Sequence, residues 1–521
     1  MKQLALDTQS FAILRNNKCV YVDKTAIIHR MITGGRIYFL SRPRRFGKSL
    51  LVSTLDALFQ GKKELFKGLD IYDKWEWEQY PVIKIDWTGI NHSTPEKMEE
   101  SLVFHLTRIA RNYQIILTAK NASDCFIELI VSLHEQSGKK KVVVLIDEYD
   151  KPITAHLNDS HLEAIKINVH DFYQVMKYAD EYLQLVFLTG VSKFSGLSIF
   201  SALNNPQDIT LREEYTAICG YTQEELESNF SEYIDRAAEH LKTTREDVLE
   251  QIRYWYNGYT WDGETAIYNP FSTMNFFQIQ EFDNYWFSTG TPTFLMEIIQ
   301  RRNCADTVLN PIVVDSSVFK EYDPVNINEV PLLFQTGYLT IKQIKRIPGE
   351  CAEYTLGVPN REVNKSLLTH LLQAYGKYPD KRYINDLRKT MQQQITNFDE
   401  SGFARSLEAM IATIPYDIQI PHEHYYHSLM LMWMQLLGFK IQGEAHNNLG
   451  SSDAVWEQAG VTVVAEIKYH AETKINMLLN EAMKQIHHRR YYNKYLGKVI
   501  LLGIAFSGKQ TGCRMEELKR E

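Results

Sequence analysis

The sequence predicts an α/β protein whose N-terminal part is built on a mostly parallel β-sheet. Uninterrupted apolar runs at residues 37–40, 142–146 and 185–188 are typical of strands buried on both faces. Helical patterns separate these runs, and such alternation of strands and helices predicts parallel strands. Polar or charged residues follow each run, at the sheet edge where open α/β proteins bind ligands. We therefore expect a functional site at this edge.

The spacing of apolar residues sets the order of the elements. We expect a helix opening near Asp23, a strand at 37–40, a helix at 48–59, a strand at 81–86, helices at 95–113 and 125–135, a strand at 142–146, a helix at 159–179 and a strand at 185–188. Leucines at core-facing spacing support the helix at 48–59.

The loop at residues 41–49 ends in Gly-Lys-Ser, the second half of a phosphate-binding loop. Backbone N–H groups at a helix N-terminus point at an anion, and the helix dipole favours negative charge there. We expect Gly47 to let the backbone approach phosphates and Lys48 to reach the β- and γ-phosphates. The Ser49 hydroxyl is expected to ligate Mg²⁺.

The first half of this motif departs from the standard pattern, because Arg42 stands where a glycine is usual. On the loop alone, an ordinary basic loop before a helix is the alternative. The residues predicted to contact ATP are Arg44, Arg45, Phe46, Gly47, Lys48 and Ser49.

The apolar run 142–146 leads directly into two acids, which favours the nucleotide interpretation. Asp147 is predicted to hold Mg²⁺ through water, and Glu148 to polarise the attacking water. Thr189 ends the run 185–188, where many ATPases place a γ-phosphate sensor. A simple strand end is the favoured interpretation of Thr189 taken alone.

Composition narrows the classes of function. A chain of 521 residues predicts several domains, and 44% hydrophobic with 23% charged residues is typical of a globular protein. The net charge of −7 excludes a polycation, so contact with nucleic acid requires a local basic patch. Six scattered cysteines and the absence of signal-peptide or membrane-spanning patterns predict a cytoplasmic protein that has no membrane partner.

Four segments together resemble the AAA-ATPase-like family: Tyr21-Val22-Asp23-Lys24, residues 42–49, residues 147–150 and residues 189–195. In that family the loop also has the sequence Arg-Pro-Arg-Arg-Phe-Gly-Lys-Ser, so Arg42 is the family's own form. The resemblance implies a P-loop fold of the additional-strand type over residues 1–220.

Residues 221–395 are predicted to be mainly helical, and the segments 255–259, 268–272 and 287–293 resemble the same family's continuation. Residues 333–339 predict a helix end, a glycine stop and a strand. A partner strand near residues 354–359 would complete a winged-helix-like unit. We interpret the many aromatic residues here as interdomain core rather than as a base-stacking surface.

The segment 396–521 predicts a second α/β domain. Its elements are a helix at 424–437, strands starting at 439 and 453, a strand at 461–468, a helix at 476–495 and a strand at 499–506. Glu466 and Lys468 share one strand face. Asp453 on the adjacent strand can meet Glu466, and two such carboxylates bind Mg²⁺ or Mn²⁺. Lys468 would then orient or deprotonate the attacking water. By spacing alone, an edge strand with alternating acid and base is the favoured explanation of the pattern.

The context of these residues resembles the PD-(D/E)XK nuclease superfamily. The matching segments are residues 450–453, 466–468 and 481–485, with Tyr491 after them. Ser451 replaces the arginine of the usual Gly-Arg-x-Asp element. The resemblance assigns Asp453, Glu466 and Lys468 to catalysis, and adds Glu423 and Glu444 to Asp453 and Glu466 as metal ligands. A basic patch at residues 487–490 suits phosphate contacts, although a solvated helix face explains it equally well.

The combined expectation is a chain that binds and hydrolyses ATP with Mg²⁺ and carries a metal-dependent nuclease acting on nucleic acid, with DNA favoured over RNA. The alternative is a nucleotide-switched regulator whose nuclease fold binds DNA or a protein without cutting, and Ser451 favours it. A small-molecule kinase is disfavoured by the C-terminal domain. Assembly into a homo-oligomer is left open.

Overall fold

A computed structural model of the chain describes residues 1–157, 159–193, 206–286, 311–319, 329–346, 348–367, 381–411, 423–439, 441–447, 450–458, 460–495, 497–508 and 510–518. For residues 381–383, 423–425, 428, 432, 442–447 and 450–452 only the backbone is described. The described residues fall into two compact units, the first within Met1–Gly290 and Ile312–Val363 and the second from Asn364 onward. Among these residues no helix is long and apolar enough to cross a bilayer.

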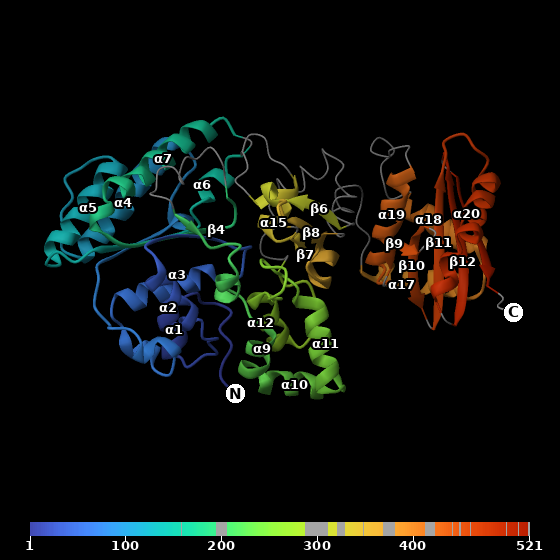
Figure 1. Cartoon of the computed structure of the whole chain (residues 1–521), viewed down its shortest axis with the longest axis horizontal. Coiled ribbons are helices and arrows are strands. Elements are labelled where there is room, and N and C mark those ends of the chain that lie inside the picture. Colours follow the sequence, from blue (N-terminus) through green and yellow to red (C-terminus); the bar gives the residue numbers. More distant parts are fainter. Residues whose placement is uncertain are drawn as a thin grey trace. The chain divides into compact units, whose positions relative to one another are not determined.

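The first unit is organised around a five-stranded parallel sheet in the order β2-β3-β4-β1-β5 (Figure 1). Its strands are β1 (Ile37–Ser41), β2 (Val82–Asp86), β3 (Val142–Asp147), β4 (Leu183–Gly190) and β5 (Gln207–Asp208). Because β4 lies between β1 and β3, the additional-strand arrangement is confirmed. The strand β5 was not predicted, since two residues carry no recognisable pattern.

Helices cover both faces of this sheet. They are α1 (Phe11–Asn16), α2 (Thr25–Gly34), α3 (Lys48–Phe59), α4 (Pro95–Asn112), α5 (Ala122–Gln136), α6 (Lys151–Thr154) and α7 (Leu162–Tyr178). In Figure 1, α2 and α3 lie on one face of the sheet and α4, α5 and α7 on the other. Every residue of β3 is buried, as its uninterrupted apolar run predicts.

The middle region of the first unit has a helical part and a small sheet. The helices are α9 (Gln223–Asn229), α10 (Ser231–Leu241), α11 (Arg245–Tyr256), α12 (Pro270–Ile279) and α15 (Glu329–Thr336). Tyr256, Tyr268, Phe276 and Phe277 pack in one buried cluster, so the interpretation of these aromatic residues as core is confirmed.

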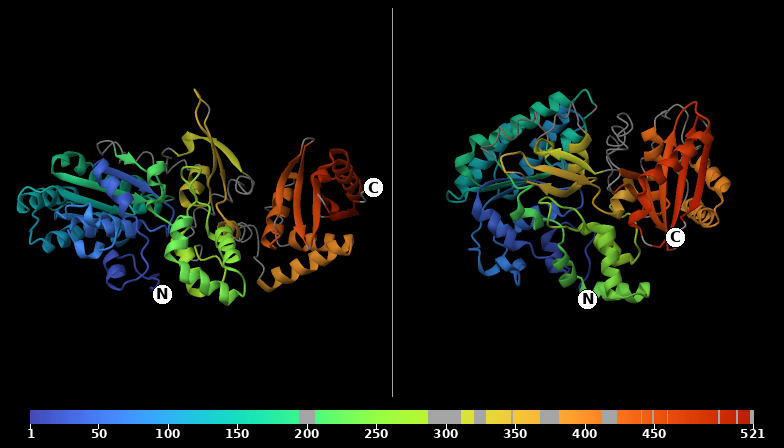
Figure 2. Two further views of the ribbon diagram at one scale, coloured as in Figure 1. Left: turned by 60° about the horizontal axis from the view of Figure 1, so that its bottom comes forward. Right: turned by 45° about the vertical axis from the view of Figure 1, so that its right-hand side comes forward.

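The small sheet has the order β6-β8-β7 and is drawn in yellow and orange in Figure 2. Its strands are β6 (Ile312–Asp315), β7 (Thr340–Lys345) and β8 (Glu353–Gly357). The predicted pairing of β7 with β8 is confirmed and is antiparallel. Gly337 has a φ of +91° and ends α15, as the sequence predicts.

The second unit contains a five-stranded mixed sheet in the order β13-β12-β11-β10-β9. The strands are β9 (Gln442–Asn447), β10 (Gly450–Gln458), β11 (Val461–Tyr469), β12 (Lys498–Ser507) and β13 (Gln510–Glu517). The helices are α17 (Lys381–Thr396), α18 (Glu400–Ile411), α19 (Glu423–Leu436) and α20 (Ile475–Arg489).

One expectation for this unit was wrong in detail, and one strand was not predicted. The helix predicted to reach Tyr495 ends at Arg489, because Arg490 adopts a left-handed conformation (φ +49°) before a 3₁₀ turn at Tyr491–Lys494. The strand β13 was not predicted, because only Cys513 and Met515 of its residues are buried and apolar.

Candidate active sites

The phosphate loop joins β1 to α3 with the geometry that its sequence predicts. Gly47 caps α3 with a φ of +93°, a conformation that costs glycine little and other residues more. The Lys48 ammonium is almost completely buried and donates hydrogen bonds to the carbonyl oxygens of Arg42 and Pro43, at 3.0 and 3.1 Å. The lysine is therefore held at the loop, where phosphate oxygens would lie.

Ser49 and Asp147 lie together at the carboxyl end of β3, where both line a small cavity. Burial raises the pKa of the Asp147 carboxyl, and the Ser49 hydroxyl and the nearby Lys48 partly oppose that rise. Asp86 on β2 lies beside Asp147 in the sheet register. A hydroxyl and carboxylates on the wall of one cavity form a donor set that Mg²⁺ prefers, so the residues fit the metal. No pattern in the sequence predicts this place for Asp86.

Glu148 follows Asp147 in a left-handed conformation (φ +52°), which is unfavourable for a glutamate. Its backbone N–H donates to Asp147 Oδ1 at 3.0 Å. Glu148 is also one of the residues that line a cavity over the phosphate loop. Strained backbone of this kind is concentrated at functional sites, where the surrounding structure maintains it.

A cavity of about 770 Å³ opens over the phosphate loop. All six loop residues predicted to contact ATP line it, from Arg44 to Ser49. The apolar side chains of Tyr21, Val22 and Met274 line it as well. Its size and its mixture of cationic and apolar walls suit a nucleoside triphosphate.

Thr189 lies in β4 and is fully buried. Its hydroxyl donates a hydrogen bond to the carbonyl oxygen of Leu40 in β1, at 2.9 Å. It is not among the residues that line the cavity. These contacts favour the strand-end interpretation over the γ-phosphate sensor, which stays a prediction.

Two buried charged residues, Arg42 and Asp150, lie beside the residues of this site. The sequence patterns predicted no contact with ATP or metal for either of them. The Arg42 guanidinium is fully buried, and Nη1 donates to the carbonyl oxygens of Ser41 and Thr210, each at 2.9 Å. Burial lowers its pKa to about 10. Asp150 accepts the Ser192 N–H at 2.7 Å, and burial, with the charge of Glu148, raises its pKa to about 6.

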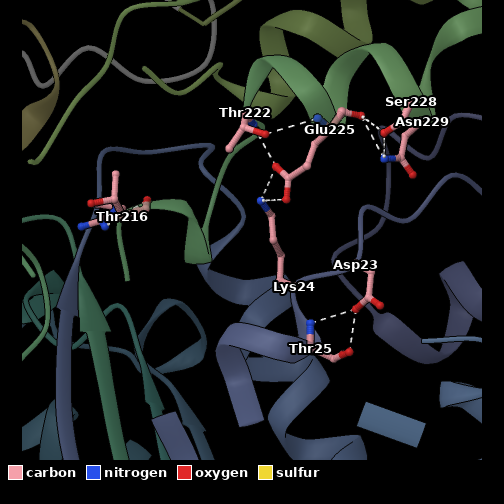
Figure 3. A network of polar contacts seen from close by, with 9 residues as sticks. Asp23, Lys24, Thr25, Thr216, Thr222, Glu225, Ser228 and Asn229 are labelled. Carbon is pink, nitrogen blue, oxygen red and sulfur yellow. Dashed lines mark hydrogen bonds and ion pairs between the residues drawn. The ribbon is translucent and has the colours of Figure 1, made fainter. Parts of the chain in front are cut away.

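Lys24 lies on the cavity wall and forms an ion pair with Glu225, as Figure 3 shows. Glu225 also accepts the backbone N–H of Thr222, so the same carboxylate caps α9. Lys24 belongs to the Tyr-Val-Asp-Lys segment that resembles the AAA-ATPase-like family. Its partner Glu225 lies 201 residues further along the chain, so the segment alone did not indicate the ion pair.

In the second unit, Asp453 on β10 and Glu466 on β11 lie on adjacent antiparallel strands, each next to a residue of the cross-strand pair Ala454 and Ala465. Asp453 Oδ2 accepts the backbone N–H of Ile467 at 2.7 Å, and Lys468 Nζ lies 3.3 Å from Glu466 Oε1. The three residues predicted to be catalytic are therefore together.

Glu466 is fully buried, and among the described residues its Oε2 has no hydrogen-bond partner. Burial raises the pKa of its carboxyl well above the usual range, and the negative charge of Asp453 raises it further. An unsatisfied buried carboxylate oxygen is costly, and a divalent cation would satisfy it. The residues present thus fit a metal.

Helix α20 packs over this pair on the Glu466 face of the sheet. A Cβ on Gly503, the residue beside Glu466 on β12, would lie 3.1 Å from Met483 Sδ of α20. Gln485 Nε2 donates to the Tyr491 hydroxyl at 3.3 Å, and the carboxyls of Glu466 and Asp453 help to raise the Tyr491 pKa.

The structure gives the backbone position of two predicted metal ligands and of one departure from the superfamily pattern. Glu423 begins α19 and Glu444 lies in β9, but their side chains lie outside the described residues, as does that of Ser451 in β10. In the described part of the chain, His, Cys, Asp and Glu residues form no group of three or more that could hold a metal.

A family model described as a predicted AAA-ATPase matches residues 5–200, and one described as the PD-(D/E)XK nuclease superfamily matches residues 421–516. The chain belongs to this family of AAA-ATPase-like proteins that carry a C-terminal PD-(D/E)XK nuclease superfamily domain. It is similar along its length to the "Uncharacterized protein in vnfD 5'region" of Azotobacter chroococcum mcd 1. The two are 36% identical over 519 residues, which cover 97% of this chain and 96% of that protein.

Proposed function

We propose that the first unit binds ATP with Mg²⁺ and hydrolyses it, and that the second unit cleaves DNA with a divalent metal under the control of the nucleotide. The observation that carries the first half is that Ser49 and Asp147 line one small cavity, while Ser49 also lines the larger cavity over the phosphate loop. The fold thus brings together two residues that lie 98 positions apart in the sequence and that ATP hydrolysis requires near one metal, with Asp147 acting through water.

In this proposal each residue has one task at the ATP site. Lys48 neutralises the β- and γ-phosphates, and the Ser49 hydroxyl with Asp147 holds Mg²⁺. Glu148 accepts a proton from the attacking water, and its conformation directs it to the cavity. The bound Mg²⁺ supplies electrostatic stabilisation of the phosphoryl group.

The test compares ATP binding by calorimetry with phosphate release for wild type, Lys48→Ala and Glu148→Gln. Loss of one charge-assisted contact in Lys48→Ala is expected to weaken ATP binding by about 10- to 100-fold. Glu148→Gln should bind ATP and fail to hydrolyse it. The exposed Lys67→Ala is the matched control. Unchanged binding in Lys48→Ala would refute the ATP site.

The nuclease half of the proposal rests on the ion pair of Lys468 with Glu466 and on the Asp453 carboxylate, which accepts the N–H of Ile467 between them. Asp453 and Glu466 would hold Mg²⁺ or Mn²⁺, which supplies Lewis-acid stabilisation of the charge on the scissile phosphate. The Lys468 ammonium is positioned to orient the attacking water. The basic residues at the end of α20 would contact the DNA backbone.

Plasmid cleavage with Mg²⁺ or Mn²⁺, with and without ATP, tests this half. Cleavage by wild type and its loss in Lys468→Ala, with Lys474→Ala as the control, would support the nuclease. ATP dependence would show control by the nucleotide. If ATP is hydrolysed and no condition gives cleavage, the alternative is a nucleotide-switched protein that binds DNA or a partner without cutting.

A further inference from the structure

The five residues that precede Gly47, Arg42 to Phe46, all contact the middle region of the first unit. The Arg42 guanidinium lies 3.9 Å from the ring centre of Trp261, and the Arg45 guanidinium lies 4.9 Å from that of Phe271. Both are cation–π contacts. The part of the loop that departs from the glycine-rich pattern is thus attached to residues more than 200 positions away in the sequence.

Phe46 and Pro43 extend the same interface. The Phe46 ring meets Tyr259 edge-on, with ring centres 4.8 Å apart. Pro43 lies against Gly337, where an added Cβ would approach the Pro43 Cβ to 2.7 Å. The middle region is therefore packed too closely against the loop for the loop to move independently of it.

Arg44 connects the loop to a longer path through its backbone. Its carbonyl oxygen accepts the Trp286 indole N–H at 3.2 Å, and the Trp286 backbone N–H donates to Glu362 Oε1 at 2.8 Å. The Trp286 ring is buried against Tyr338, with ring centres 5.2 Å apart, so it cannot swing away easily. Glu362 is fully buried, and loss of its donor would be costly.

Glu362 lies where the chain leaves the first unit. It belongs to a helix at 361–367, and the first unit ends at Val363 while the second begins at Asn364. A phosphate group on the loop is bound through loop backbone groups, so its arrival changes the position or stiffness of the Arg44 carbonyl.

We infer that Trp286 is a positioning residue that transmits the nucleotide state of the phosphate loop, through Glu362, to the helix at 361–367 that leads into the second unit. This inference rests on the proposed ATP site and gives it a route of communication. The physical basis is one buried residue that donates two hydrogen bonds, from its indole N–H to the loop and from its backbone N–H to Glu362.

Hydrogen exchange of the full chain, with and without ATPγS and Mg²⁺, tests the route. In wild type, nucleotide is expected to slow exchange at residues 41–48 and to change it at residues 361–367. Trp286→Phe keeps the ring position but removes the indole donor. At saturating nucleotide this variant should retain the change at the loop and lose the change at 361–367. Its nucleotide affinity should fall by about 2- to 10-fold.

Two further variants separate the route from general damage. Trp255→Phe removes a tryptophan of the same unit that stacks on Phe282, and it should behave as wild type. Glu362→Gln keeps an acceptor for the Trp286 N–H and should preserve the response, whereas Glu362→Ala should lose it. If the loop responds and residues 361–367 do not, or if their response persists in Trp286→Phe, the inference is wrong. If the wild-type loop itself does not respond, the proposed ATP site is wrong, and the inference falls with it.

Discussion

The Lys24 ammonium lies 2.6 Å from both carboxylate oxygens of Glu225, and this ion pair joins α2 to the first helix of the middle region (Figure 3). Burial lowers the pKa of Lys24, and the charge of Glu225 opposes that effect. Lys24 lies on the wall of the cavity over the phosphate loop, so the pair links α2 to the middle region beside that cavity.

Lys24→Met should destabilise the first unit strongly, because it leaves the Glu225 carboxylate partly buried without its cation. We expect a loss of about 3 kcal/mol in the free energy of unfolding. Calorimetric unfolding of the full chain measures it. The matched control is Lys97→Met, which removes the lysine of an exposed pair with Glu100 and should have no measurable effect. Equal effects of both variants would contradict this view of the pair.

Arg42→Lys should also be damaging, although it conserves charge. The Arg42 guanidinium donates to Thr210 and Tyr215 carbonyl oxygens and stacks on Trp261, and an ammonium cannot make this set of contacts. We expect the free energy of unfolding of Arg42→Lys to be lower than that of wild type by about 2–3 kcal/mol. The same substitution at the exposed Arg30 is the control. A melting temperature equal to that of wild type would show that the guanidinium contacts are unimportant.

The stability of the first unit should depend on pH through Glu362. Burial raises the pKa of its carboxyl from 4.5 to about 7, so between these values the folded protein holds a proton that the unfolded chain has released. The contribution of Glu362 to stability is therefore present below pH 4.5 and is lost as the pH rises through 7. Between pH 5 and pH 8, the free energy of unfolding should fall by roughly 3 kcal/mol more in wild type than in Glu362→Gln. Melting curves over this range test the difference, with the exposed Glu350→Gln expected to follow wild type.

Divalent metal should stabilise the second unit through Asp453 and Glu466. At 100 times the dissociation constant, a ligand that binds only the folded state adds about 2.7 kcal/mol. In the absence of nucleotide, Mg²⁺ or Mn²⁺ should therefore raise the melting temperature of wild type. The same metal should raise the melting temperature of Asp453→Asn much less. Glu457→Gln changes an exposed acid of the same strand and is the control. A metal effect that survives Asp453→Asn would place the binding elsewhere.

The sequence predicted best those elements that depend on local pattern. The run 142–146 and the helix at 48–59 appear where expected, as β3 and α3, because burial on both faces and leucine spacing leave a clear signature. The placement of Asp453 and Glu466 on neighbouring strands was predictable from strand alternation and a short hairpin. These features require only residues that are close in the sequence.

Features that depend on distant partners were not predictable. The role of Arg42 depends on Thr210 and Trp261, and that of Lys24 depends on Glu225. Nothing in the local sequence marks such pairings. The same holds for Thr189, whose hydroxyl could have faced either the cavity or the neighbouring strand until β1 was placed beside it.

The packing of Arg42, Pro43, Arg45 and Phe46 against Trp261, Gly337, Phe271 and Tyr259 has an evolutionary consequence. Each of these loop positions packs against a partner far along the chain. Substitutions in the two segments should therefore arise in pairs among relatives. A chimaera that takes only residues 5–200 from one relative would separate residues that pack against each other.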